Sequence, residues 1–310
     1  MAGWLVTGGT GFLGRHLLRA LARGTWGDKV VTLGRRCPPG WERRFVAADL
    51  EQPEDVARAV REVGPDVVIH AAGRTPPATP GEFERLNLRA TLHLLDALAG
   101  AGRPVRVVLV GSAAEIGPVD EADLPVGEDH PCRPADAYAW SKCLATLAGM
   151  LVRPPVEVVV ARVFNPVGPG LPATQALGQF AARLLDPSAG PLLVGDLDAR
   201  RDFVDVRDVA RALVALAGSG RPGRVYHVGT GVSHRVGDAL ERLQWQSGRS
   251  IEVRVDPARA VARGPIDSRA DIRRIVTETG WRPMIGWEQS LDDLWHEAAA
   301  QARVALPLTA

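Results

Sequence analysis

A short apolar strand, Trp4-Leu5-Val6, runs directly into the glycine-rich turn TGGTGFLG at 7–14, and an apolar helix follows. The first glycine permits a tight turn, the second lets the backbone approach a pyrophosphate, and the third lets the helix pack closely on the strand. A phosphate would then meet free N–H groups at the helix N-terminus, where the helix dipole favours an anion. A strand, turn and helix in this order predict a dinucleotide-binding domain. Its candidate cofactor contacts in the turn are Gly8, Thr10, Gly11, Phe12, Leu13 and Gly14.

The type of dinucleotide is indicated by the end of the second expected strand, 30–33, which is followed by Gly34-Arg35-Arg36. An NAD site usually carries an acidic side chain here to bind the ribose 2′-hydroxyl, whereas arginine accommodates the 2′-phosphate of NADP. The planar guanidinium groups of Arg35 and Arg36 suit a phosphate. We therefore predict NADP(H) as the cofactor. The alternative is two solvated arginines in a surface loop.

Apolar strands alternate with helical patterns through the first half of the chain, and this alternation predicts an α/β fold with a doubly wound parallel (Rossmann) sheet. Further strands are expected at 44–47, 67–70, 106–111 and 156–162, and helices at 54–61, 82–99 and 138–151.

The rhythm breaks after Val163, where the chain becomes rich in proline and glycine. We expect a dinucleotide-binding domain over 1–163 and a smaller, mixed substrate-binding lobe over 164–310. Segments at about 200–230 are expected to return to the core of the first domain. A chain of 310 residues is long enough for this arrangement.

Composition argues against several other classes of protein. The formal net charge is +1, with charges of both signs interspersed, so nothing favours binding to nucleic acid or to an anionic membrane. The three cysteines show no CxxC spacing, so neither a disulfide framework nor a metal site is expected. No apolar run is long enough to span a bilayer, and no leader precedes the first strand. We expect a cytoplasmic protein.

Tyr138 and Lys142 lie four residues apart in an expected helix, although the chain has only two tyrosines and two lysines. Residues i and i+4 share one helix face, so the phenol and the ammonium can converge. A nearby ammonium favours the phenolate and brings its pKa toward a range useful for proton exchange. The alternative is an exposed lysine beside a half-buried tyrosine.

In open α/β sheets the ligand lies outside the carboxyl ends of the strands, so residues just past each strand are candidate contacts. Asp49 and Leu50 follow the third strand and could bind and cover an adenine ring; alternatively, Asp49 caps the next helix. Small residues after the fourth strand would let a cofactor pass close to the backbone. Ser112 follows the fifth strand and would face Tyr138. The small residues are Ala71, Ala72 and Gly73.

Taken together, these residues resemble the extended short-chain dehydrogenase/reductases, a family that acts mainly on nucleotide-linked sugars. The resemblance covers nearly the whole chain. It rests on the turn at 7–14, Asp49-Leu50, His70-Ala71-Ala72, Asn87, Ser112, Tyr138-x-x-x-Lys142, Asn165-x-x-Gly168-Pro169, the segment 201–210, and 255–259 with Asp267.

The resemblance implies a catalytic triad. Tyr138 would exchange a proton with a substrate oxygen, Ser112 would hydrogen-bond that oxygen, and Lys142 would bind the nicotinamide ribose and lower the tyrosine pKa. Hydride would move between the nicotinamide and the carbonyl carbon. The second lobe would bind a nucleotide diphosphate, with arginines on its phosphates unless these form surface salt bridges instead. The expected substrate contacts are Ser112, Ala113, Glu115, Asn165, Arg201 and Arg263.

The reaction is predicted from what the chain lacks. Dehydratases of this family carry Thr-Asp-Glu where this chain has Ser112-Ala113-Ala114, and alanine supplies neither acid nor base. Glu115 stands one position too late, although a loop shift could restore it. The 4-epimerases usually carry the acidic residue that is missing after the second strand. The segment 194–203 is similar to the matching stretch of GDP-4-keto-6-deoxymannose reductases.

We therefore expect an NADPH-dependent reductase of the 4-keto group of a nucleotide-linked 6-deoxyhexose. The alternatives are a sugar-nucleotide 4-epimerase that retains its cofactor, a reductase of a small non-sugar ketone, and a non-catalytic NADP-binding sensor. The family resemblance also implies a homodimer that pairs the helices at 82–99 and 138–151. Leu144, Leu147 and Leu151 would form the pairing stripe or would face their own sheet.

Overall fold

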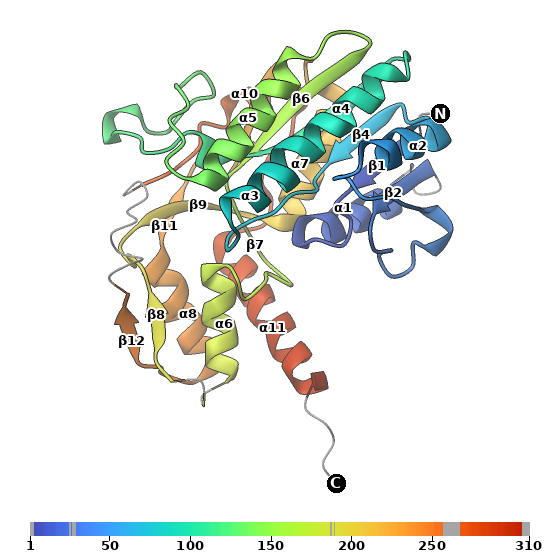
Figure 1. Cartoon of the computed structure of the whole chain (residues 1–310). Helices are drawn as coiled ribbons and strands as arrows, with labels where there is room; N and C mark the ends of the chain where they lie inside the picture. Colours follow the sequence, from blue (N-terminus) through green and yellow to red (C-terminus); the bar gives the residue numbers. More distant parts are fainter. Residues whose placement is uncertain are drawn as a thin grey trace.

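A seven-stranded sheet forms the centre of the larger lobe in the computed structural model, which describes residues 3–24, 26, 29–186, 188, 190–256 and 267–305 (Figure 1). Neighbouring strands all pair in parallel, in the order β10-β6-β5-β4-β1-β2-β3. Their bounds are β1 Trp4–Thr7, β2 Val30–Gly34, β3 Phe45–Ala47, β4 Val67–His70, β5 Val105–Ser112, β6 Val156–Val163 and β10 Arg224–Val228.

Helices cover both faces of this sheet, which confirms the predicted doubly wound α/β fold. On one face α1 and α7 pack together, and their buried leucines join the sheet residues Val6 and Ile69 in one core. On the other face α2 and α4 pack against Leu5 and Val68. Their bounds are α1 Phe12–Arg23, α2 Pro53–Val63, α4 Ala90–Gly100 and α7 Val206–Ser219. Successive side chains of one strand point to opposite faces of the sheet and thus belong to two different cores.

The helix expected at 82–99 is three segments. It starts with α3 (Pro80–Phe83), continues as the π-helical turn η3 (Glu84–Arg89) and ends as α4. Thr79 caps its beginning, since its side chain accepts from the backbone of Glu82 while the Glu82 carboxylate bonds back to Thr79. The wide turn of η3 carries the buried Asn87.

The smaller lobe, which lies below the large sheet in Figure 1, has its own apolar core. A three-stranded sheet in the order β11-β9-β7 and the pair β12-β8 are packed against three helices. The strands are β7 Asn165–Val167, β8 Leu192–Val194, β9 Arg200–Asp205, β11 Ser233–Arg235 and β12 Val253–Val255, and the helices are α6 Ala176–Leu185, α8 Val236–Ser247 and α11 Trp287–Ala305.

Between β9 and β11 the chain passes back through the larger lobe. The helix α7 packs on α1, and β10 pairs in parallel with β6 at the edge of the large sheet. The helix α10 (Arg273–Thr279) lies against β10 and α7. The second half of the chain therefore contributes to both lobes.

Asp202, on β9, connects segments that are far apart in the sequence. Its carboxylate is fully buried and accepts hydrogen bonds from the backbone nitrogens of Thr230, Gly231 and Ala270 at 2.7, 2.9 and 3.0 Å, and from the Thr230 hydroxyl at 2.7 Å. Burial raises its pKa, and these four donors oppose the rise. Such a charge-assisted cluster compensates for the desolvation of the carboxylate.

Two further carboxylates of the segment 201–210 act in the same way. Asp205 accepts from the hydroxyl of Ser290 on α11 at 2.7 Å. Asp208 accepts from the backbone nitrogens of Met284 and Ile285 at 2.8 and 2.9 Å. The segment 201–210 is therefore hydrogen-bonded to residues 284, 285 and 290, close to the C-terminal end of the chain.

Replacing Asp202 by alanine is expected to lower the free energy of unfolding by about 3 kcal/mol or more, because three buried backbone donors lose their acceptor. Urea unfolding followed by circular dichroism measures this. The control is Asp198→Ala, whose side chain is 85% exposed; it should change the free energy by at most about 0.5 kcal/mol. Equal losses in the two variants would contradict the assignment.

Candidate active site

The glycine-rich turn lies against the end of β4 so closely that side chains are excluded. Gly8 has a φ of +76°, and a Cβ atom on it would lie 2.6 Å from the backbone of Ala71 and of Ala72. A Cβ atom on Gly14 would lie 2.0 Å from the Gly8 oxygen. The helix α1 begins after Gly11, which has no side chain to occupy the free N–H groups. The N-terminus of α1 is thus open to an anion.

At the end of β2, Arg35 and Arg36 are both exposed. The guanidinium of Arg35 lies 4.0 Å from the Asp49 carboxylate and 3.9 Å from that of Glu51, which are long, solvent-exposed pairs. The alternative role of Asp49 as a helix cap is wrong, because Gln52 is the N-cap of α2. Asp49 instead accepts from the backbone of Glu51 at 3.1 Å.

A chain of hydrogen bonds fixes the end of β4. The Thr91 hydroxyl donates to the Asn87 carbonyl at 2.6 Å and so accepts from His70 Nε2 at 3.1 Å. The other nitrogen, Nδ1, then accepts from the Thr7 hydroxyl at 2.8 Å, and Thr7 accepts from the nitrogen of Ala72 at 3.2 Å. Burial lowers the pKa of His70 to about 3, so the ring is neutral. These bonds hold the backbone at 71–72 against the turn.

Ser112 and Tyr138 meet at the carboxyl end of β5. Tyr138 stands in the first turn of α5 (Ala137–Leu151), which Asp136 caps by accepting from the Ala139 nitrogen at 2.8 Å. The Tyr138 ring packs edge-on against Phe83, with ring centroids 5.5 Å apart. Burial raises the pKa of Tyr138, and a hydrogen bond with the Ser112 side chain opposes the rise. The phenol therefore carries its proton at neutral pH.

Lys142 lies one turn further along α5, buried, and its Nζ donates to the carbonyl of Val110 on β5. Burial lowers the pKa of Lys142, and the carboxylate of Glu115 opposes this. The sequence predicted that Lys142 would lower the pKa of Tyr138. In the structure burial raises the pKa of Tyr138, and the carboxylates of Glu115 and Asp136 raise it further, so the effect of Lys142 on the phenol stays a prediction.

Glu115 does not face a substrate, and this corrects the sequence prediction. It is fully buried in the short 3₁₀ turn η4 (Ala113–Glu115) that follows β5. One carboxylate oxygen accepts from the Ser112 nitrogen at 2.7 Å, and the other accepts from Arg162 Nε at 3.2 Å. Both oxygens are thus engaged behind Ser112, and the loop shift that could have turned Glu115 toward the site has not occurred.

The smaller lobe contains a cavity of about 300 Å³, and Asn165, just past the end of β6, is one of the residues that line it. Asn165 donates to the carbonyl of Asp202 at 3.0 Å, and Arg201 and Phe203 of β9 line the same cavity. Burial lowers the pKa of Arg201, while Asp196 and Asp267 oppose this. Arg263 lies outside the residues that the structure describes.

The sequence reasoning missed two side chains of this site. Phe83 supports the Tyr138 ring, and Arg162 pairs with Glu115. A signal for Arg162 was present, because it is a single cation at the end of the otherwise apolar stretch Val158-Val159-Val160-Ala161. Within the described part of the chain, no group of three or more side chains could hold a metal ion. No helix there is both long and apolar enough to cross a bilayer.

Comparison with known proteins agrees with this geometry. The chain is 33% identical to GDP-6-deoxy-D-mannose reductase of Pseudomonas aeruginosa, covering 92% of this chain and 93% of that protein. It is 32% identical to dTDP-6-deoxy-L-talose 4-dehydrogenase (NAD(P)(+)) of Kitasatospora kifunensis, covering 94% and 93%. The structure of RMD from Pseudomonas aeruginosa complexed with NADPH matches with a TM-score of 0.83 and 30% identity, covering 97% and 100%.

A family model also matches residues 4–229, and its description is the NAD dependent epimerase/dehydratase family. The chain belongs to the NAD dependent epimerase/dehydratase family. The resemblance to the extended short-chain dehydrogenase/reductases is thereby confirmed.

Proposed function

We propose that this chain is an NADPH-dependent reductase that converts the 4-keto group of a nucleotide-diphosphate-linked 6-deoxyhexose to an alcohol. The observation that carries the proposal is the protonated phenol of Tyr138, hydrogen-bonded to Ser112 at the carboxyl edge of the sheet. Reduction of a ketone creates an alkoxide that must receive a proton. A phenol that holds its proton at neutral pH can supply it.

Each member of the triad has a distinct task in this mechanism. The Ser112 hydroxyl orients the carbonyl oxygen, and Tyr138 donates a proton to that oxygen as its charge develops. Lys142 places a positive charge beside the phenol and favours the phenolate that this donation leaves behind. The cofactor, when bound, supplies the hydride. The open N-terminus of α1 and the small residues at 71–73 would hold its pyrophosphate and nicotinamide parts.

The surroundings of Ser112 support reduction over dehydration. Removal of water from the sugar needs an acid and a base beside the reacting carbons. Ala113 and Ala114 offer neither, and the carboxylate of Glu115 is buried against Ser112 and Arg162. The relatives point to the same chemistry, since one is named a GDP-6-deoxy-D-mannose reductase and another a dTDP-6-deoxy-L-talose 4-dehydrogenase.

The cavity of the smaller lobe supports a substrate that carries a nucleotide diphosphate. Arg201, the amides of Asn165 and Gln179, and one carboxylate, Asp196, line it together with apolar side chains. The guanidinium and the amides suit a charged diphosphate, and the apolar side chains suit a base. A small non-sugar ketone would need no such site. We therefore assign the substrate contacts outside the triad to Asn165 and Arg201.

We also propose that two copies of the chain pair through α5. Its side chains Leu144, Leu147 and Leu151 are 40%, 51% and 74% exposed, so the alternative that this stripe faces its own sheet is wrong. Trp140 on the same helix and Leu92 on α4 are exposed as well. An apolar stripe of this kind on a twofold-related pair of helices would be buried in a dimer.

Replacement of Tyr138 by phenylalanine should lower kcat for a GDP- or dTDP-linked 4-keto-6-deoxyhexose about 10²- to 10⁴-fold, because the proton donor is lost while the ring remains. NADPH affinity should change little, since the phenol hydroxyl is not required for binding the phosphates. Absorbance at 340 nm measures turnover, and fluorescence titration measures binding. Normal turnover in Tyr138→Phe would contradict the mechanism.

The paired substitution of Arg35 and Arg36 by alanine should weaken NADPH binding about tenfold or more, because the 2′-phosphate loses charge-assisted hydrogen bonds. Affinity for NADH should stay unchanged. Calorimetric titration of both cofactors tests this, with the exposed Arg58→Ala on α2 as the control. If both cofactors weaken equally, or neither does, the prediction of NADP is wrong.

Sedimentation velocity should give twice the 33.1 kDa chain mass for the parent protein. The substitution Leu147→Glu should convert it to a monomer, since a charge buried at the pairing face is costly. Val232→Glu, at a residue of similar exposure (55%), is the matched control and should leave the mass unchanged. A parent protein that sediments as a monomer at micromolar concentration would refute the dimer.

A further inference from the structure

Arg162 is a buried cation at the carboxyl end of β6, in a strand that is otherwise apolar at its interior positions. Its side chain is 3% exposed. The Nε donates to Glu115 at 3.2 Å, the Nη2 donates to Cys132 Sγ at 3.2 Å, and the Nη1 lies 3.4 Å from Nε2 of His227. Burying a guanidinium is costly unless it is paired. The partners on three sides fix both the position and the direction of this group.

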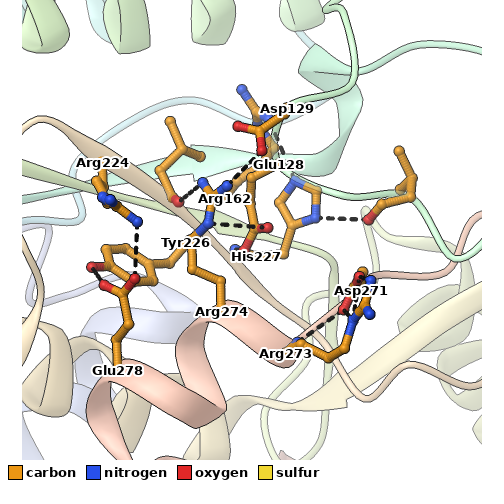
Figure 2. Close-up of polar contacts among 12 residues, drawn as sticks. Glu128, Asp129, Arg162, Arg224, Tyr226, His227, Asp271, Arg273, Arg274 and Glu278 are labelled. Carbon is orange, nitrogen blue, oxygen red and sulfur yellow. Dashed lines mark hydrogen bonds and ion pairs between the residues drawn. The ribbon is translucent and has the colours of Figure 1, made fainter.

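His227 serves as a neutral acceptor for Arg162 (Figure 2). Its Nδ1 lies 3.1 Å from the carbonyl oxygen of Val126, and a carbonyl only accepts, so the proton of the ring is on Nδ1. Nε2 is then free to accept from the guanidinium. Burial and, to a smaller extent, the charge of Arg162 together lower the pKa of His227 to about 3, so the ring stays neutral.

Glu115 links the buried pair of Arg162 and His227 to the backbone of Ser112. Glu115 accepts from the Ser112 nitrogen at 2.7 Å, and the Ser112 hydroxyl accepts from the Ala114 nitrogen at 3.2 Å. These two hydrogen bonds therefore fix the conformation of the turn after β5. A shift of the Glu115 carboxylate would move Ser112, and with it the hydroxyl that contacts Tyr138.

The charge of Glu115 also acts on the other two members of the triad. It raises the pKa of Tyr138, as does Asp136, and it raises that of Lys142 against the effect of burial. The guanidinium of Arg162 lies directly on this carboxylate and offsets its charge.

We propose that Arg162 is a positioning residue of the active site, which fixes and neutralises Glu115 and thereby holds Ser112 in place and limits the action of the carboxylate on Tyr138. This role rests on the proposed function, because it concerns the residues that would carry out the proton transfer. Arg162 itself is bonded to Glu115, Cys132 and His227, and it acts on the reaction only through Glu115.

The first test needs no substrate. Protein labelled with ¹³C at the tyrosine Cζ position has two labelled rings, Tyr138 and Tyr226, and Tyr138→Phe assigns them. In Arg162→Met the pKa of Tyr138 should rise, because the carboxylate of Glu115 has lost the cation that offsets its charge. In Glu115→Gln it should fall, and the double variant should lie between the two.

Two further variants make the titration decisive. Arg162→Lys should raise the Tyr138 pKa as Arg162→Met does, because burial lowers the pKa of the replacing ammonium, which then loses its charge at the alkaline pH where a phenol titrates. Arg106→Met removes a cation from the neighbouring strand β5, where Arg106 pairs with Glu157, and should leave the Tyr138 pKa unchanged. If Arg162→Met does not fold, Glu115→Gln carries the test. A Tyr138 pKa that is unchanged in folded Arg162→Met, or in Glu115→Gln, overturns the proposal.

The second test is a kinetic double-mutant cycle with Ser112→Ala at pH 7, where Tyr138 is protonated. Arg162→Met should lower kcat about 10²-fold, the cost of a small misplacement of a reacting group. KM and NADPH affinity should stay nearly constant. In the Ser112→Ala background the same change should cost about threefold or less, because residues that act as a unit are not additive.

The same full loss of kcat in both backgrounds would show a general structural role and overturn the proposal. If the parent protein reduces no nucleotide sugar, the proposed function fails. The titration of Tyr138 still decides the role of Arg162 in that case, because it requires neither substrate nor turnover.

Discussion

The backbone of Gly8 lies so close to the backbone of Ala71 and Ala72 that no side chain fits between β1 and β4 at the carboxyl edge of the sheet. The strand order reverses at this point, since β2 and β3 lie on one side of β1 and β4, β5 and β6 on the other. In doubly wound sheets the ligand lies at this reversal. The open N-terminus of α1, the pair Arg35-Arg36 and the Ser112–Tyr138 contact follow the carboxyl ends of β1, β2 and β5, which lie at this reversal or beside it.

Buried charge is the second organising element of the molecule, and each buried carboxylate described above has a structural partner. Asp202 binds three backbone nitrogens and so joins β9 to segments up to 68 residues away. Glu115 binds the Ser112 nitrogen and Arg162. Removing one partner of such a group leaves the other unsatisfied in a low-dielectric interior. The backbone of Ser112 is thus held by a buried ion pair whose further partners come from β6 and β10, where Arg162 and His227 stand.

Local patterns in the sequence predicted the features that depend on local structure. The apolar runs gave the strands β1 to β6, and the turn at 7–14 was placed correctly between strand and helix. The π-helical turn at 84–89 was missed because the pattern of apolar residues over 82–99 fits one continuous helix and does not reveal a single wider turn within it. The direction of Glu115 was also missed, since it depends on Arg162, a partner from another strand. No spacing in the chain reveals such contacts.

The transfer of deuterium from [4-²H]NADPH of the reactive face to a GDP- or dTDP-linked 4-keto-6-deoxyhexose tests the central claim most directly. A net reductase places the label on carbon 4 of the hexose and releases one NADP⁺ for each alcohol formed, which proton NMR and absorbance measure in the same sample. Label that stays on the cofactor while the sugar is epimerised, or a cofactor that is bound and never oxidised by either sugar, would contradict it.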